Sequence, residues 1–141
     1  IDYKKANLNE SLRELCPEGI DVVFDNVGGE FLNLSLTHLA MNAKVVLCGA
    51  ISTYNDETPT PGPSNYMSLV IMRAKMEGFI VLDYLDRFPE AASKLRQWVE
   101  EEEINYLEDI QEGIENAPDT LVRLFTGQNF GKQLLKIAEP E

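Results

Sequence analysis

Two short apolar runs, each ending at glycine, most strongly limit the folds open to this chain. The first covers residues 20–27 and stops at Gly28-Gly29, and the second covers residues 45–48 and stops at Gly49. Runs of this kind are typical of strands buried on both faces. Between them, residues 30–41 repeat apolar side chains at helical spacing. A strand, a helix and a strand in this order predict a crossover connection and a parallel sheet.

The same alternation continues on both sides of these runs. We expect a helix over residues 8–15 with Asn7 as its cap, a short helix over 66–75, a third strand over 77–82 and a helix over 89–101. Leu95, Trp98 and Val99 would form the buried face of that last helix. The sequence therefore predicts an α/β fold with an open parallel sheet.

Two stretches depart from this rhythm. Residues 55–65 contain Pro59, Pro61 and Pro63, which forbid regular helix or strand pairing and predict a long exposed loop of the kind that often covers a site. Beyond Glu103 we expect a half-exposed strand at 104–111, a helix at 118–125 closed by Gly127, and a last strand at 133–137. This tail predicts a domain boundary, with residues 1–103 and 104–141 belonging to different domains.

Composition excludes several classes of function. The net charge of −12 argues against general binding to nucleic acid or to anionic membranes. The single histidine, His38, and the two cysteines, Cys16 and Cys48, have none of the usual zinc-ligand spacings, so no metal site is predicted. We expect Cys48 to be a small apolar residue that fills space in a buried strand. We expect His38 to be a surface or hydrogen-bonded residue of the helix predicted over residues 30–41. This cysteine usage fits a reducing, cytoplasmic compartment.

Candidate ligand-binding residues lie at the carboxyl ends of the three predicted parallel strands. Asn26 ends the first strand, residues 49–54 follow the second and end in the hydroxyl of Tyr54, and residues 79–81 lie at the end of the third. Ligands of open α/β sheets bind beyond the carboxyl ends of the strands. Each feature also has a simpler interpretation: Gly28-Gly29 as a turn, Asn26 as its cap, and Tyr54 as a packing residue. The spacing alone predicts a ligand-binding edge and leaves its chemistry open.

The motifs along the chain resemble those of a known family. They are DNVGGE at 25–30, CGAISTYN at 48–55, PGP at 61–63, EGFIV at 77–81, EGIENAP at 112–118 and GQNFGK at 127–132. In this order they resemble the zinc-independent medium-chain dehydrogenase/reductases of the prostaglandin reductase type. The resemblance implies the C-terminal half of a Rossmann-type doubly wound parallel sheet, plus a return segment that belongs to the catalytic domain.

The resemblance also implies an activity, an NADP(H)-dependent reduction of the C=C bond of α,β-unsaturated aldehydes and ketones. Tyr54 would be the catalytic residue, because its neutral hydroxyl can stabilise the negative charge that develops on the substrate carbonyl oxygen. Lys4 would assist beside the adenosine phosphate. The implied cofactor-binding residues are Tyr3, Asn26, Cys48, Gly49, Ala50, Ile51, Ser52, Thr53, Tyr54, Phe79, Ile80, Val81 and Asn129.

Two further implications concern assembly and completeness. The family resemblance implies a homodimer, and the loop at 55–65 would border the substrate pocket. No GxGxxG phosphate turn occurs in the chain, so it resembles only the carboxyl-terminal part of such an enzyme. A related quinone reductase and a non-catalytic binding or oligomerisation module are the alternative functions.

This incompleteness generates a first prediction. We expect the isolated chain of residues 1–141 to bind NADPH weakly or not at all, because the backbone amides that hold the pyrophosphate are missing from it. We also expect it to reduce no substrate. A fluorescence titration of the isolated chain with NADPH checks this, and binding in the micromolar range would contradict it.

Overall fold

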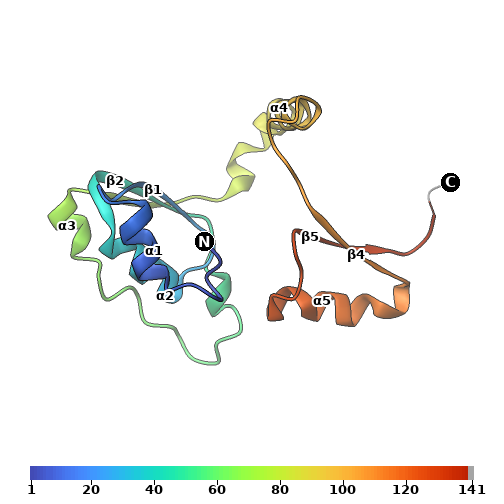
Figure 1. The fold of residues 1–141 in the computed structure, drawn as a ribbon, viewed down its shortest axis with the longest axis horizontal. Helices are drawn as coiled ribbons and strands as arrows, with labels where there is room; N and C mark the ends of the chain where they lie inside the picture. The colour runs from blue at the N-terminus through green and yellow to red at the C-terminus, as the bar shows by residue number, and fades with distance from the viewer. Residues whose placement is uncertain (140–141) are drawn as a thin grey trace. The chain divides into compact units, whose positions relative to one another are not determined.

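The computed structural model describes residues 1–139 and separates the chain into two compact units. The first unit is Ile1–Leu85 and the second begins at Asp86 (Figure 1). The predicted domain boundary near Glu103 falls inside the second unit and stays a prediction. No helix in residues 1–139 is long and apolar enough to cross a membrane.

A three-stranded parallel sheet forms the centre of the first unit. Its strands are β1 (Ile20–Asp25), β2 (Leu39–Leu47) and β3 (Lys75–Gly78), in the order β1-β2-β3. α1 (Leu8–Leu15) precedes β1, and α2 (Gly29–Thr37) connects β1 to β2. The short helical turn η1 (Ile51–Thr53) and α3 (Ser68–Met72) lie between β2 and β3, and a second helical turn, η2 (Val81–Arg87), begins in this unit after β3. The α/β fold with a parallel sheet is confirmed.

The core of this unit lies between the sheet and α2. Its buried side chains are Val23, Leu32, Leu36, Leu39, Ala43 and Val45. Outside this core, Asn7 caps α1 as predicted, because its Oδ1 accepts the backbone N–H groups of Asn9 and Glu10 at 3.1 and 3.3 Å. His38 lies directly after α2, with its Nε2 2.7 Å from Oδ1 of Asn9. The histidine therefore links the end of α2 to the start of α1.

The predicted helix over residues 30–41 is wrong at its end. α2 stops at Thr37, and Leu39 already belongs to β2. The backbone N–H of Ile20 donates to the carbonyl of His38 at 2.7 Å, and the strand passes so close that a Cβ on Gly19 would lie 2.6 Å from the nitrogen of Ala40. Leu39 is buried in the strand, as it would also be on the apolar face of a helix. Its apolar spacing therefore fits a helix and a strand equally well.

The third strand begins and ends earlier than the predicted 77–82. Its last pairing joins Gly78 to Leu47, and the N–H of Phe79 then donates to the carbonyl of Leu47 at 3.0 Å. The chain next turns into η2. Phe79 packs its ring against Phe24 and Tyr84, with ring centroids 5.9 and 6.0 Å apart. Residues 79–81 therefore follow the strand rather than form it.

The second unit is built on a two-stranded parallel sheet. It contains α4 (Phe88–Glu100), β4 (Glu108–Glu112), the helical turn η3 (Ile114–Asn116), α5 (Ala117–Thr126) and β5 (Lys132–Lys136), with β4 paired to β5. Gly127 ends α5 in the left-handed conformation at φ +61°, as the sequence predicts. The predicted strands at 104–111 and 133–137 are present with shifted ends.

The predicted burial of α4 is wrong for the described residues. No residue of α4 is buried, and Leu95 and Val99 are 51% and 37% exposed. Trp98 is only partly covered, and the ammonium group of Lys94 lies 5.8 Å from its ring centroid. Helical periodicity identifies which face of a helix is apolar, but it does not supply a neighbouring element to cover that face.

Candidate functional site

The ends of β1 and β2 are joined by backbone hydrogen bonds. The N–H groups of Cys48 and Gly49 donate to the carbonyl of Asp25 at 2.8 and 3.3 Å, and the N–H of Ile51 donates to the carbonyl of Asn26 at 3.0 Å. These bonds hold the loop after β2 against the turn after β1. The predicted convergence of Asn26 with residues 48–51 therefore follows from strand pairing that extends past the ends of the strands.

The hydroxyl of Tyr54 lies against the loop after β2. The N–H of Ala50 donates to Oη of Tyr54 at 3.4 Å. A Cβ added at Gly49 would lie 2.9 Å from the same Oη and 3.7 Å from Oδ1 of Asn26. The absence of a side chain at Gly49 thus lets a phenol hydroxyl and an amide approach one backbone segment. The Tyr54 side chain is 66% exposed, which leaves the rest of its ring accessible.

The hydroxyls of Ser52 and Thr53 shape the loop. Ser52 Oγ donates to the carbonyl of Val27 at 2.6 Å, and Thr53 Oγ1 donates to the carbonyl of Ala50 at 2.9 Å. Facing Ser52, Gly29 has φ +53°, and a Cβ on it would lie 3.0 Å from Ser52 Oγ. A glycine is therefore required there by both its conformation and the close packing.

Asp25 is the functional candidate that the sequence reasoning missed. Its side chain is fully buried, and its Oδ1 accepts the N–H groups of Val27 and Gly28 at 2.8 and 3.0 Å. The carboxylate thereby fixes the backbone on either side of Asn26. Asp25 does alternate away from the exposed edge, as expected, but that orientation is what lets it organise the turn. The signal in the sequence is the spacing, because an aspartate readily accepts the backbone N–H groups of the residues two and three positions after it.

The remaining predicted residues lie in other places. Phe79, Ile80 and Val81 follow the end of β3, the neighbour of β2, and Ile80 and Val81 are 55% and 49% exposed. Tyr3 lies in the turn before α1 and is 68% exposed. Asn129 belongs to the second unit. Among residues 1–139, no group of three or more His, Cys, Asp or Glu side chains could hold a metal ion.

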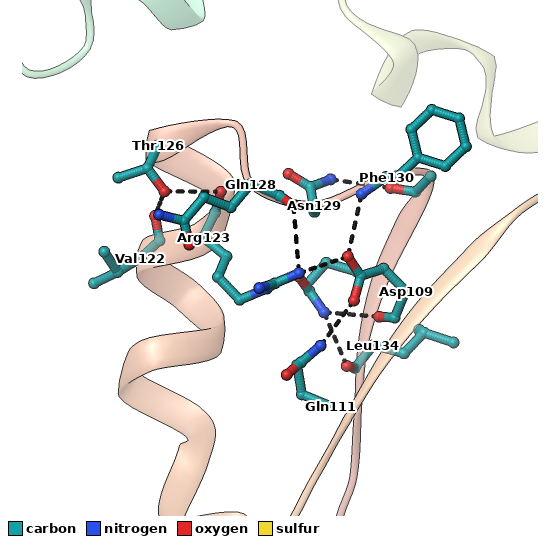
Figure 2. Close-up of polar contacts among 11 residues, drawn as sticks. Asp109, Gln111, Val122, Arg123, Thr126, Gln128, Asn129, Phe130 and Leu134 are labelled. Carbon is teal, nitrogen blue, oxygen red and sulfur yellow. Dashed lines mark hydrogen bonds and ion pairs between the residues drawn. The ribbon is translucent and has the colours of Figure 1, made fainter.

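Asn129 lies in the loop between α5 and β5, which a polar network surrounds (Figure 2). The carboxylate of Asp109 accepts hydrogen bonds from Gln111 Nε2 at 2.8 Å, from the N–H of Phe130 at 3.2 Å and from Arg123 Nη2 at 2.6 Å. The Gln111 amide, followed by the Phe130 N–H and the Arg123 guanidinium, lowers the pKa of Asp109 below its ordinary value of 3.8.

Comparison with known proteins identifies a family and several relatives. Residues 1–98 match the family described as zinc-binding dehydrogenase. The chain is 38% identical over 143 aligned positions to the NADPH-dependent curcumin reductase of Escherichia coli, covering 98% of the chain and 41% of the relative. It is 37% identical over 139 positions to the NADP(+)-dependent 2-alkenal reductase of Nicotiana tabacum, covering 98% of the chain and 40% of the relative.

A solved structure agrees with these relatives. The crystal structure of CurA from Vibrio vulnificus in complex with NADPH matches with a TM-score of 0.86 and 39% identity, covering 99% of this chain and 43% of that protein. The chain therefore spans about two fifths of the length of the relatives it matches. The match confirms the predicted likeness to the carboxyl-terminal part of Rossmann-type oxidoreductases.

The buried carboxylate of Asp25 generates a stability prediction. Replacing it (Asp25→Ala) leaves the N–H groups of Val27 and Gly28 without their acceptor and should lower the free energy of unfolding by about 2 kcal/mol. The matched control is Asp21→Ala, an exposed aspartate of the same strand, which should change it by less than about 0.5 kcal/mol. Denaturant unfolding measures both, and equal losses would contradict the assigned role.

The contacts of Asp109 generate a pH prediction. In an NMR titration of its carboxyl group, the midpoint should fall below 3.8, and Gln111→Ala should raise it. Because the pKa is lowered in the folded state, the carboxylate contributes its full stabilisation above pH 3.8. That stabilisation is lost as the pH falls below 3.8 toward the folded-state pKa. A midpoint above 3.8 would contradict the network in Figure 2.

Proposed function

This chain belongs to the zinc-binding dehydrogenase family, and from that premise we propose that it forms the carboxyl-terminal part of an NADPH-dependent enone reductase. The reaction is transfer of hydride to the C=C bond of α,β-unsaturated aldehydes and ketones. The observation that carries the proposal is that the Tyr54 hydroxyl and the Asn26 amide meet over the backbone of Gly49 at one sheet edge. The names of the E. coli and tobacco relatives support the substrate class.

The residues present fit a nicotinamide cofactor. The Asn26 side chain lies beside Gly49 and offers both a donor and an acceptor, which suits recognition of a carboxamide or a ribose. When bound, NADPH supplies the hydride. The backbone of residues 48–53, Tyr3, Asn26 and the apolar residues 79–81 are proposed to bind and orient it. Asn129 joins this set through the family resemblance.

Tyr54 is proposed to act on the substrate. Its hydroxyl donates a hydrogen bond to the carbonyl oxygen of the enone, where negative charge develops as the β-carbon is reduced. The hydroxyl is held by the N–H of Ala50, and that bond leaves the phenolic proton available for a second partner. The same group can donate a proton to the enolate. A zinc-independent reaction, a homodimer and a cytoplasmic location complete the proposal, each resting on the same resemblance.

The proposal is tested in the full-length protein that carries this sequence. The Tyr54→Phe variant should lower kcat for an alkenal or enone by about tenfold or more, because it removes the hydroxyl that stabilises the developing charge. The Kd for NADPH should stay within about twofold of the unaltered value. Stopped-flow kinetics and fluorescence titration measure the two quantities separately.

The matched control is Tyr66→Phe, which removes a similarly exposed hydroxyl from the segment before α3 and should leave both quantities unchanged. Equal losses of turnover and cofactor affinity in Tyr54→Phe would contradict its catalytic role. The unaltered protein should also prefer alkenals and enones to quinones. A higher kcat/KM for quinones would favour the quinone reductase alternative.

A further inference from the structure

The loop between α5 and β5 is fixed at both of its ends. At the start, the N–H of Gln128 donates to the carbonyl of Arg123 at 3.1 Å, and the carbonyl of Gln128 accepts from Arg123 Nη2 at 3.4 Å. At the other end, the N–H of Lys132 donates to the carbonyl of Leu107 at 2.7 Å. Asn129 lies between these fixed points.

Gly131 explains how tightly the end of this loop is held. It has φ +85°, and an added Cβ would come within 2.8 Å of Cβ of Leu107 and would overlap the Leu107 carbonyl. Residue 131 therefore has to be glycine, and the loop cannot shift away without losing the bond from Lys132. The path of the backbone around Asn129 is thus strongly constrained.

The middle of the loop is held by Asp109, across 21 positions of sequence. Its carboxylate accepts the N–H of Phe130, the residue directly after Asn129. The same carboxylate pairs with Arg123, whose Nε donates to Gln133 Oε1 at 3.0 Å, while Gln133 Nε2 donates to the carbonyl of Asp109 at 2.7 Å. These bonds close a ring between α5, β4 and β5 at the base of the loop, and Figure 2 shows Asp109 and Arg123 within it.

The Asp109–Arg123 pair differs from the other ion pairs among residues 1–139. Its side chains are 26% exposed for Arg123 and 16% for Asp109, whereas those of Arg87 and Glu90 are 64% and 69% exposed. Exposed pairs contribute little to structure, but a sheltered, charge-assisted pair with several donors holds its geometry. Such an arrangement positions a loop more accurately than a surface contact does.

Within this frame the Asn129 side chain is partly buried and hydrogen-bonded, whereas the Phe130 side chain beside it is exposed. Asn129 Nδ2 donates to the carbonyl of Gly131 at 3.0 Å, and Phe130 is 76% exposed. We propose that Asp109 and Arg123 are positioning residues that hold the 127–131 loop so that Asn129 can bind the nicotinamide cofactor. This inference rests on the proposed function.

The experiment uses the full-length protein and combines two measurements. We expect Asp109→Asn to raise the Kd for NADPH about tenfold, the order associated with losing a charge-assisted hydrogen bond, and to speed hydrogen exchange of the amides at 128–132. In an Asn129→Ala background, Asp109→Asn should cause no further rise, because the pair acts through Asn129. The control Glu90→Gln removes the negative charge of the exposed Arg87–Glu90 pair and should change neither the Kd for NADPH nor the hydrogen exchange at 128–132.

Arg123→Lys cannot reproduce the fork of the guanidinium, so it should also raise the Kd for NADPH. Because it keeps the positive charge, the rise should be smaller than that caused by Asp109→Asn. It carries the test, with the same Asn129→Ala cycle, if Asp109→Asn fails to fold. An unchanged Kd in folded Asp109→Asn would overturn the inference, and so would an equal rise with and without Asn129. If the unaltered protein binds no NADPH, the proposed function itself fails, and this inference fails with it.

Discussion

The buried carboxylate of Asp25 is the contact on which the geometry of the first unit's candidate site depends. Its Oδ1 accepts two consecutive amides, those of Val27 and Gly28, and so fixes the turn that leaves β1. The carbonyl of the same residue accepts the amides of Cys48 and Gly49 and so holds the loop that leaves β2. One residue thereby sets both the conformation of each strand end and the distance between them.

The positions of Asn26, Gly49 and Tyr54 at this sheet edge depend on these hydrogen bonds of Asp25. The side chain of Asn26 is carried on the turn that the carboxylate fixes, and Gly49 is carried on the loop that the carbonyl holds. Tyr54 then closes the arrangement by placing its hydroxyl on the amide of Ala50. A phenol hydroxyl in this position requires a residue without a side chain beneath it, because any Cβ at Gly49 would lie 2.9 Å from Oη.

The sequence predicts those parts of the structure that depend on neighbouring residues. Capping of α1 by Asn7, the left-handed end of α5 at Gly127 and the parallel order of strands around α2 all follow from short-range patterns. The end of α2 could not be predicted, because Leu39 has the same apolar spacing in a helix as in the strand that pairs with Ile20. The exposure of α4 could not be predicted either, because helical periodicity does not show whether another element packs against the apolar face.

The two asparagines proposed to bind the cofactor show the same limit in the site itself. Each is followed by a residue whose backbone amide is accepted by an aspartate: Val27 by Asp25, and Phe130 by Asp109. The physical device is the same, since a carboxylate that accepts a backbone amide fixes the peptide next to the asparagine. For Asn26 the aspartate is its sequence neighbour and can be read as a turn signal. For Asn129 it comes from β4, 21 positions away, and only the pairing of β4 with β5 brings it to the loop. The contacts that a fold assembles from distant segments are therefore those that the sequence alone conceals.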